Sequence, residues 1–373
     1  METSGKLLGL FFLSIVLFAE CKSDDSELLS QQLDELKASY IEDSRTKLFE
    51  FEIKENVVKG FTDQPSLKNE LKEFLAGKSI IDSVLLVPNE TQLMDTLALV
   101  NVSVANIRSQ PKHSAELSTQ ALMGMPVRVL YKTGGWYRVQ TPDKYLGYIE
   151  SGVLSFVSEI PEGRVVFSEE LGFLFEEPSE SSKHLSDLVL GNLFEPMESN
   201  RGFQKVKLPD GREGFIPQNQ LKSIDDFVST ASAGDLEFMT SRFLGVPYLW
   251  GGTSFKGVDC SGFSKNVMLQ KGIYLPRDAS QQALVGDEIE TGENFENLER
   301  GDLLFFGRPP GKVTHVAIYL GNQRFIHSSG MVKYGSFDPA SPEYDEFNRN
   351  RFLFAKRVLN SDRVSRLNPI TFY

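Results

Sequence analysis

Three observations predict an α+β protein of several domains. The chain has 373 residues, which is more than one ordinary domain holds. An alternation of apolar and polar residues, typical of short strands, occurs twice in the middle of the chain. The last third joins a helical pattern, which follows a Gly-rich turn, to a β-hairpin pattern. Helix and sheet are therefore expected together in the last domain.

Composition limits the possible partners. Apolar residues make up 40% of the chain and include 28 Phe, enough to fill several cores. The formal net charge is −12, and the sequence has no long basic run. Proteins that bind nucleic acid need a basic face, so we expect no nucleic-acid partner.

The first residues are expected to be a targeting segment at residues 1–21. Lys6 precedes the apolar run Leu7–Ala19, which is too short to span a bilayer comfortably. Cys21 follows and resembles the lipidated cysteine of a bacterial lipoprotein signal, although Glu20 stands where a small residue is preferred. A plain signal peptide cut nearby is the alternative. We expect export to the periplasm or cell envelope, with membrane contact only through a lipid on Cys21.

Residues 26–95 are expected to form a small mixed region without recognisable chemistry. Apolar residues at helical spacing predict two helices there, and these residues are Leu28, Leu33 and Leu36, then Leu67, Leu71, Phe74 and Leu75.

An internal repeat predicts two small β modules. The run GWYRVQTPD at residues 135–143 is matched by GFQKVKLPD at residues 202–210, and GYI at 147–149 is matched by GFI at 214–216. Alternation between Pro-Asp turn signals is typical of short antiparallel strands. The two modules are expected at residues 98–158 and 162–225. The polar residues 223–234 are expected to form a linker, and the last domain is expected at 235–373, starting with a helix over 235–244.

Cys260 is the first candidate for chemistry. It follows a Gly-rich turn and precedes a helical apolar pattern, so it is expected in the first turn of a helix. Free backbone N–H groups and the helix dipole favour a thiolate there, so a lowered thiol pKa is expected. The other cysteine is Cys21, so if Cys21 is lipidated or removed, Cys260 has no disulfide partner. A lone thiol in an exported protein is either buried and inert or kept for its reactivity.

A histidine is the expected base for this thiol. The chain has four histidines, of which His113 and His184 lie in the β repeats and are expected on the surface. His315 opens a strand that is followed by a Gly321-Asn322 turn and a second strand containing His327. A two-residue turn would put the two imidazoles on opposite faces, whereas a three-residue loop or a bulge would put them on one face. If they share a face, His315 can take the thiol proton and His327 can orient it. Thiolate and imidazolium together predict a bell-shaped pH profile.

The spacing of this Cys and these His matches no compact zinc motif, so neither a metal nor another cofactor is expected.

Several motifs of the last domain occur in a family order. They are PYLWGG at 247–252, DCSGF at 259–263, LPRDASQQ at 275–282, GDLLFF at 301–306, HVAIY at 315–319 and IHS at 326–328. This part of the chain resembles the NlpC/p60 family of cell-wall cysteine peptidases. The two β modules resemble bacterial SH3-like barrels, and the whole chain resembles the γ-D-glutamyl-L-diamino acid endopeptidases of that family.

The resemblance implies a papain-like fold in which a helix carrying Cys260 packs on an antiparallel sheet carrying His315. Cys260 would be the nucleophile, His315 the base and His327 the third member of a triad. The implied partners are peptidoglycan fragments with a free N-terminal L-alanine. They would be cut between γ-D-glutamate and the diamino acid through a thioester.

The resemblance also implies substrate-binding residues, among them a carboxylate for the free amine. Asp259, beside the nucleophile, is the first candidate, and the first β module would supply others. The expected set is Asp259, Ser261, Tyr248, Ser280, Glu116 and Tyr145, whereas Arg277 is expected to hold loops.

Two alternatives stay open. One is a cysteine amidase or acyltransferase of the same fold, and the other is a non-catalytic wall-binding protein built on the β modules. A monomer is expected, and the diamino acid is left undetermined.

Overall fold

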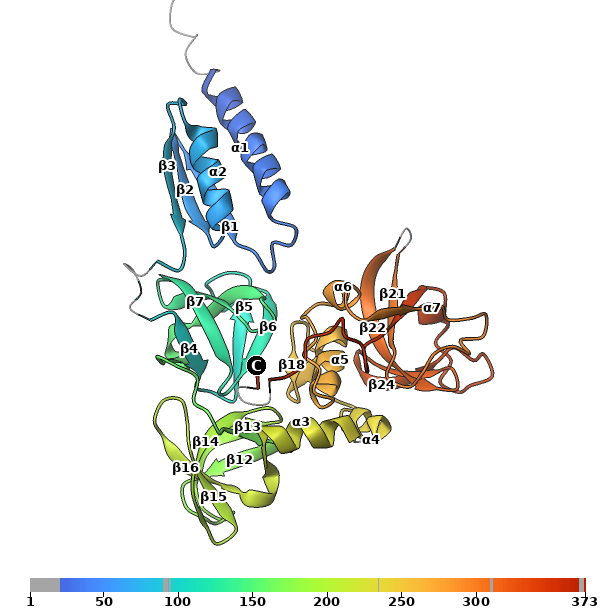
Figure 1. The fold of residues 1–373 in the computed structure, drawn as a ribbon. Helices are drawn as coiled ribbons and strands as arrows, with labels where there is room; N and C mark the ends of the chain where they lie inside the picture. The colour runs from blue at the N-terminus through green and yellow to red at the C-terminus, as the bar shows by residue number, and fades with distance from the viewer. Residues whose placement is uncertain (1–20, 90–92, 94, 234, 309–310, 369–371) are drawn as a thin grey trace, which may run out of the picture. The chain divides into compact units, whose positions relative to one another are not determined.

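The computed structural model describes residues 21–89, 93, 95–233, 235–308, 311–368 and 372–373 (Figure 1). The chain divides into two compact units, Met1–Val87 and Pro88–Tyr373. The predicted targeting segment at 1–20 lies outside the described residues. No helix in the described part of the chain is long and apolar enough to cross a membrane.

The first unit is a small sheet with two helices. Its elements are α1 (Cys21–Tyr40), β1 (Phe49–Lys54), β2 (Val57–Thr62), α2 (Pro65–Leu75) and β3 (Ile81–Leu86). β1 and β2 form an antiparallel pair, whereas β2 and β3 are parallel, so α2 serves as the crossover between them. Leu33 and Leu67 are fully buried in the core of this unit, which confirms the two predicted helices.

The second unit begins with one sheet that we call the first sheet module. Its elements are β4 (Leu97–Val100), β5 (Val104–Arg108), β6 (Leu117–Leu122), β7 (Pro126–Thr133), β8 (Trp136–Gln140), β9 (Leu146–Glu150), the 3-10 turn η1 (Ser151–Val153) and β10 (Leu154–Phe156). The strand order is β10-β4-β7-β8-β9-β5-β6. Val129, Val139 and Ile149 are buried at its centre.

The second sheet module repeats this plan. Its elements are β11 (Val165–Phe167), β12 (Leu171–Phe175), β13 (His184–Val189), β14 (Leu193–Asn200), β15 (Phe203–Lys207), β16 (Glu213–Pro217), the 3-10 turn η2 (Gln218–Gln220) and β17 (Leu221–Ser223). The strand order is β13-β12-β16-β15-β14-β11-β17. Read from its other end, this is the order of the first module with every strand replaced by its repeat mate. The predicted sequence repeat is therefore a repeat of topology.

The predicted linker at 223–234 is wrong in its local structure, because most of it forms helix α3 (Ile224–Ala233). Ile224 and Phe227 are each 4% exposed and pack with Leu269 and Phe372. Apolar residues three positions apart fall on one helix face, so this short stretch has a buried side despite its polar composition.

The rest of the chain, which we call the C-terminal module, contains one larger sheet. Its strand order is β20-β25-β21-β22-β23-β24, with β20 (Asp287–Ile289), β21 (Leu303–Arg308), β22 (Lys312–Gly321), β23 (Arg324–Ser329), β24 (Met331–Ser336) and β25 (Phe352–Arg357). A small hairpin, β18 (Thr253–Ser254) and β19 (Gly257–Val258), precedes the sheet. The helices are α4 (Leu236–Ser241), α5 (Cys260–Leu269), α6 (Ala279–Gln282) and α7 (Glu346–Arg349).

Helix α5 packs against β22 and β23, and Figure 1 shows α5 beside the sheet that contains β22. Phe263 and Val267 of α5 share one buried cluster with Val316, Ile318 and Ile326 of the sheet. The apolar face of α5 thus fixes the helix on the sheet, with its N-terminus near the start of β22. The boundaries predicted from the sequence inside the second unit stay predictions.

Candidate active site

Cys260 is the first residue of α5, as predicted, and its side chain is 8% exposed. Asp259 is the N-cap, and its carboxylate accepts a hydrogen bond from the backbone N–H of Gly262 at 2.7 Å. A Cβ at Gly262 would lie 2.0 Å from the carbonyl oxygen of Gly252. The Gly-rich turn can therefore approach the helix start only because this helical position is glycine.

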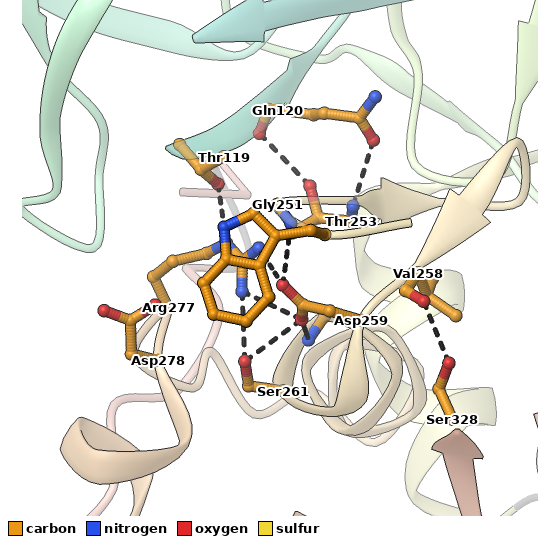
Figure 2. A network of polar contacts seen from close by, with 12 residues as sticks. Thr119, Gln120, Gly251, Thr253, Val258, Asp259, Ser261, Arg277, Asp278 and Ser328 are labelled. Carbon is orange, nitrogen blue, oxygen red and sulfur yellow. Dashed lines mark hydrogen bonds and ion pairs between the residues drawn. The ribbon is translucent and has the colours of Figure 1, made fainter. Parts of the chain in front are cut away.

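Asp259 is the centre of a buried polar network (Figure 2). Arg277 donates to both of its carboxylate oxygens, at 2.5 and 3.1 Å. The N–H of Gly251 and the hydroxyl of Ser261 donate as well, at 3.0 and 3.1 Å. With the bond from Gly262, these donors use the acceptor capacity of the carboxylate, which is about four lone-pair sites. A direct bond from substrate to Asp259 would therefore have to displace one of them.

The first sheet module contributes to the same network. Thr119 on β6 accepts from Nε of Arg277 at 3.0 Å, and Gln120 accepts from the N–H of Thr253 at 2.9 Å (Figure 2). Deeper in the interface, Asp143 pairs with Lys265, and both side chains are nearly buried. The first sheet module is thus a wall of the region around the start of α5.

A β-bulge resolves the hairpin register that the sequence left open. Gly321 pairs with Arg324, but Tyr319 pairs with Phe325 and Ile318 with Ile326, so the register shifts by one residue in between. Continued along both strands, this register puts His327 opposite Ala317, on the same face as His315. The bulge is one of the two arrangements that the predicted triad required.

The two imidazoles form a hydrogen bond. Nε2 of His315 lies 2.9 Å from Nδ1 of His327. Nδ1 of His315 is the ring nitrogen not engaged in this bond, and it can accept a proton only if Nε2 carries a hydrogen and donates it to His327. His327 then accepts at Nδ1 and carries its own hydrogen at Nε2.

The neighbour of His327 ties this hairpin to the cysteine loop. The hydroxyl of Ser328 donates to the carbonyl oxygen of Val258 at 2.9 Å (Figure 2). Val258 lies two residues before Cys260, and the backbone N–H of Val316 interacts with the Cys260 sulfur. These contacts bring the strand with His315 and the start of α5 together.

The expected lowering of the thiol pKa is wrong for this structure. Burial, with a smaller contribution from the negative charge of Asp259, raises the pKa of Cys260 to about 12. The N–H groups of Val316 and Ser261 and the charge of Arg277 oppose this shift but are outweighed. The N–H groups at the helix start do stabilise the thiolate, but the loss of hydration in this buried position destabilises the thiolate by more.

Burial shifts the pKa of both histidines in the opposite direction. Burial, with smaller contributions from the charges of His327 and Arg351, lowers the pKa of His315 to about 3. It lowers the pKa of His327 to about 4, against the charge of Asp345, which raises it. The resting pair is therefore a neutral thiol and a neutral imidazole.

The other residues expected at the site have definite places. Tyr145 of the first sheet module donates to Oδ2 of Asp278 at 3.0 Å, and Glu116 accepts from the indole N–H of Trp250 at 2.6 Å. Burial and the charges of Cys260 and Asp259 raise the pKa of Tyr248, so this side chain is a neutral hydroxyl near the sulfur. Ser280 lies on α6, half-buried, and Ser261 is bound to Asp259 and Arg277.

Three residues of this region were not predicted from the sequence, namely Trp250, Asp278 and Asp345. Trp250 and Asp278 lie inside motifs that were recognised in the sequence. Their contacts with Glu116 and Tyr145 depend on the packing of the C-terminal module against the first sheet module. Asp345 lies 3.9 Å from Nε2 of His327 and is 18 residues further along the chain, so only the fold brings it there.

His113 and His184 are exposed and pack against Trp136 and Phe173 in the sheet modules, as expected for surface residues. Among the described residues, no group of three or more His, Cys, Asp and Glu could hold a metal ion.

Comparison with known proteins supports a peptidase of this kind. The family model described as "NlpC/P60 family" matches residues 245–348, and the one described as "Bacterial dipeptidyl-peptidase Sh3 domain" matches residues 107–154. The chain is 33% identical over 260 residues to a γ-D-glutamyl-L-lysine dipeptidyl-peptidase of Bacillus cereus, which covers 65% of this chain and 76% of the relative. It is 32% identical over 223 residues to the protein of that name from Bacillus subtilis, covering 57% and 72%.

A solved structure shows the same architecture. The crystal structure of an NlpC/P60 family protein from Bacillus cereus superposes with a TM-score of 0.61 at 26% identity, covering 71% of this chain and all of that one. The predicted α+β fold class is confirmed. Along the chain, a short mixed N-terminal segment and two SH3-like modules precede a papain-like C-terminal module. Fold and relatives together define a cysteine-type peptidase. The chain belongs to the NlpC/P60 family.

Proposed function

We propose that the protein hydrolyses the bond between γ-D-glutamate and the diamino acid in peptidoglycan stem peptides that have a free N-terminal L-alanine. The observation that carries this proposal is the 2.9 Å bond between His315 and His327 on the strands that pack against the start of α5. The names of the two Bacillus relatives support the choice of bond.

The resting state is neutral, so the thiol proton moves as the sulfur attacks. Nδ1 of His315 takes the proton from Cys260 while the sulfur bonds to the carbonyl carbon of the amide. His327 accepts from Nε2–H of His315 and stabilises the imidazolium that forms. This concerted transfer avoids a separated ion pair in a buried site, which burial disfavours.

The oxyanion that develops on the carbonyl needs donors. The backbone N–H of Cys260 is the first in α5 and has no partner within the helix. The neutral hydroxyl of Tyr248 is a second donor beside the sulfur. We assign these two groups to the oxyanion.

The covalent steps balance without a cofactor. The C–N bond breaks, the proton on His315 passes to the leaving amine, and the acyl group stays on Cys260 as a thioester. His315 then takes a proton from water, the hydroxide attacks the thioester carbon, and the sulfur leaves and regains the proton.

The amine of the L-alanine meets acidic groups at the wall formed by the first sheet module. Glu116 is exposed, and Asp278 is held by Tyr145. Asp259 has its oxygens engaged by the protein, so in this proposal it positions Arg277 and Ser261 and caps α5. Ser280 lies on the same short helix that Asp278 caps and completes the wall. This wall selects an ammonium because a desolvated charge needs a partner of opposite sign.

The substrate implies a location at the cell envelope, and the export signal and the lipid on Cys21 belong to this proposal. The protein acts as a monomer.

Mass spectrometry after incubation with L-Ala-γ-D-Glu-L-Lys tests the function. The wild-type chain should release L-Ala-γ-D-Glu and lysine, and the Cys260→Ser variant should release neither. The N-acetylated peptide should be cut much more slowly, and this preference should decrease in the Glu116→Gln and Asp278→Asn variants. Turnover of ester or lipid donors in place of the peptide would favour an acyltransferase, and no turnover by the folded wild-type chain would favour a binding protein.

A further inference from the structure

A groove of about 560 Å³ opens next to Thr314, the residue before His315, and is not used by the steps above. It is lined by Gly307, Arg308, Thr314, Phe347, Asn350 and Arg351. These residues come from the end of β21, the start of β22, helix α7 and the segment between α7 and β25. All of them belong to the C-terminal module.

The groove includes the chain neighbour of the proposed base. Thr314 precedes His315 on β22. Nη2 of Arg351 donates a hydrogen bond to the hydroxyl of Thr314 at 2.5 Å. The charge of Arg351 is one cause of the low pKa of His315, so the guanidinium lies within electrostatic reach of the imidazole. A register shift between β21 and β22 leaves Thr314 out of the strand pairing at this point, between the paired residues Val313 and His315.

The groove is positively charged in a protein with a net charge of −12. Within the described part of the chain, no carboxylate forms an ion pair with Arg308 or Arg351, whereas Arg242, Arg277 and Arg357 each pair with an acid. Arg351 is instead held by Thr314, by the carbonyl oxygen of Gly307 at 3.4 Å and by the ring of Phe347 at 4.6 Å. The groove therefore has two guanidinium groups that form no ion pair with a carboxylate of the described chain, and such a pair is suited to bind an anionic group of a ligand.

The direction of the substrate places this groove on the leaving side. His315 gives its proton to the leaving amine, so the leaving amino acid must pass next to that imidazole. The opposite side of Cys260 is walled by the first sheet module, with Thr119, Tyr145 and Glu116, and is assigned to the amino-terminal part of the peptide. The leaving part therefore extends toward Arg351 and Arg308.

We propose that this groove binds a free carboxylate of the leaving diamino acid, with Arg351 and Arg308 as its ligands. The proposal rests on the proposed function and adds a specificity element on the leaving side. Phe347 is 67% exposed and offers its ring to the aliphatic part of the diamino acid. The carboxylate has two sources, the α-carboxylate at the end of the chain or a second carboxylate on the side chain of a diamino-dicarboxylic acid. Both present the same planar group to a guanidinium.

Three substrates distinguish the sources. The first is L-Ala-γ-D-Glu-L-Lys with a free C-terminal carboxylate, the second is its C-terminal amide, and the third carries meso-diaminopimelate with an amidated α-carboxyl. We expect kcat/KM for the free acid to exceed that for the lysine amide by roughly tenfold or more, as a hydrogen-bonded charge warrants. A third substrate as good as the first would assign the groove to the side-chain carboxylate as well.

Arginine variants test the ligands. Arg308→Gln and Arg351→Gln should bring the ratio of acid to amide toward one, and Arg351→Lys should keep part of it because the charge remains. Arg308 is exposed, and in the described part of the chain its side chain forms no ion pair, so Arg308→Gln is expected to fold. The matched control is Arg201→Gln, an exposed residue in a turn of the second sheet module, which should leave the ratio unchanged.

The ratio is the decisive quantity because a change in the pKa of His315 acts equally on both substrates. Similar kcat/KM values for all three substrates, or differences that neither Arg308→Gln nor Arg351→Gln alters, would overturn the groove proposal while the proposed function stands. A folded wild-type chain that cuts none of the three peptides would overturn the proposed function itself.

Discussion

Nε2 of His327 lies 3.9 Å from Oδ2 of Asp345 and has no hydrogen-bond partner among the described residues. His327 is fully buried, so this nitrogen is an unsatisfied polar group beside a carboxylate. In the tautomer that the proposed mechanism uses, Nε2 of His327 carries a hydrogen near this negative charge. In the proposed mechanism, Asp345 would follow Cys260, His315 and His327 as a positioning residue that acts through His327.

Replacement of Asp345 by asparagine should lower activity and shift its acid limb. The charge of Asp345 raises the pKa of His327, so its loss makes the imidazole less basic and a poorer support for the His315 imidazolium. Asparagine caps helices as well as aspartate, so α7 should stay intact. We expect kcat to fall about tenfold, by analogy with one charged hydrogen bond, with KM nearly constant and the acid limb moved to lower pH.

The pH dependence of kcat measures this effect, and Asp338→Asn is the control. Asp338 also accepts a backbone N–H in a turn, from Ala340 at 2.8 Å, but has no contact with a histidine. An Asp345→Asn profile that coincides with the wild-type profile would remove Asp345 from the mechanism.

Cys260 should react slowly with alkylating agents in the absence of substrate. Its pKa is raised to about 12, so only a small fraction is thiolate at neutral pH. The rate with iodoacetamide should rise about tenfold per pH unit up to at least pH 10, because only the thiolate reacts. The experiment uses a Cys21→Ser background, in which Cys260 is the remaining thiol. A plateau below pH 8 would show a stabilised thiolate and contradict the neutral resting pair.

The same pKa values change the pH profile expected from the sequence. A thiolate–imidazolium pair predicts a bell, but a neutral pair with pKa values of about 12 and about 3 predicts a broad plateau. The sequence correctly predicted that Cys260 lies at the start of a helix, but it does not show how deeply the sulfur is buried.

The sequence predicted most where one local signal decided the structure. The alternating repeat and its Pro-Asp turns predicted two equivalent modules, and the apolar face after Cys260 predicted α5. It could not decide the hairpin register, because a bulge between Tyr319 and Gly321 depends on packing on both faces of the sheet. The engagement of Asp259 by Arg277 was hidden for a similar reason, since residues 18 positions apart meet only in the fold.

Stability should fall in acid through His327. Its folded pKa of about 4 is below the usual 6.5, so the unfolded chain binds the proton more tightly. The stability that the neutral imidazole confers is complete above pH 6.5 and is lost as the pH falls toward 4. One pKa unit corresponds to about 1.4 kcal/mol, so the wild type should lose roughly 3 kcal/mol more than His327→Gln between pH 7 and 4.

Urea unfolding at each pH gives these free energies. His184→Gln is the control, because His184 is exposed and stacked on Phe173, and its stability curve should run parallel to that of the wild type. Parallel curves for His327→Gln and the wild type would show that His327 does not titrate in this range.

The last prediction concerns the pair of Lys265 and Asp143, which joins α5 to the first sheet module. Both side chains are nearly buried, at 10% and 6% exposure, and Lys265 also donates to the carbonyl oxygen of Leu275 at 2.9 Å. Lys265→Met leaves the Asp143 carboxylate buried without its cation, which should cost about 3–5 kcal/mol of unfolding free energy. The double variant Lys265→Met, Asp143→Leu removes both charges and should recover most of that loss, since an apolar pair of similar volume often replaces a buried ion pair without cost. Urea unfolding of the wild type, both single variants and the double variant completes the cycle. A double variant as unstable as the sum of the single variants would mean that the two charges do not support each other, and the contact between α5 and the wall of the site would then depend on its apolar neighbours alone.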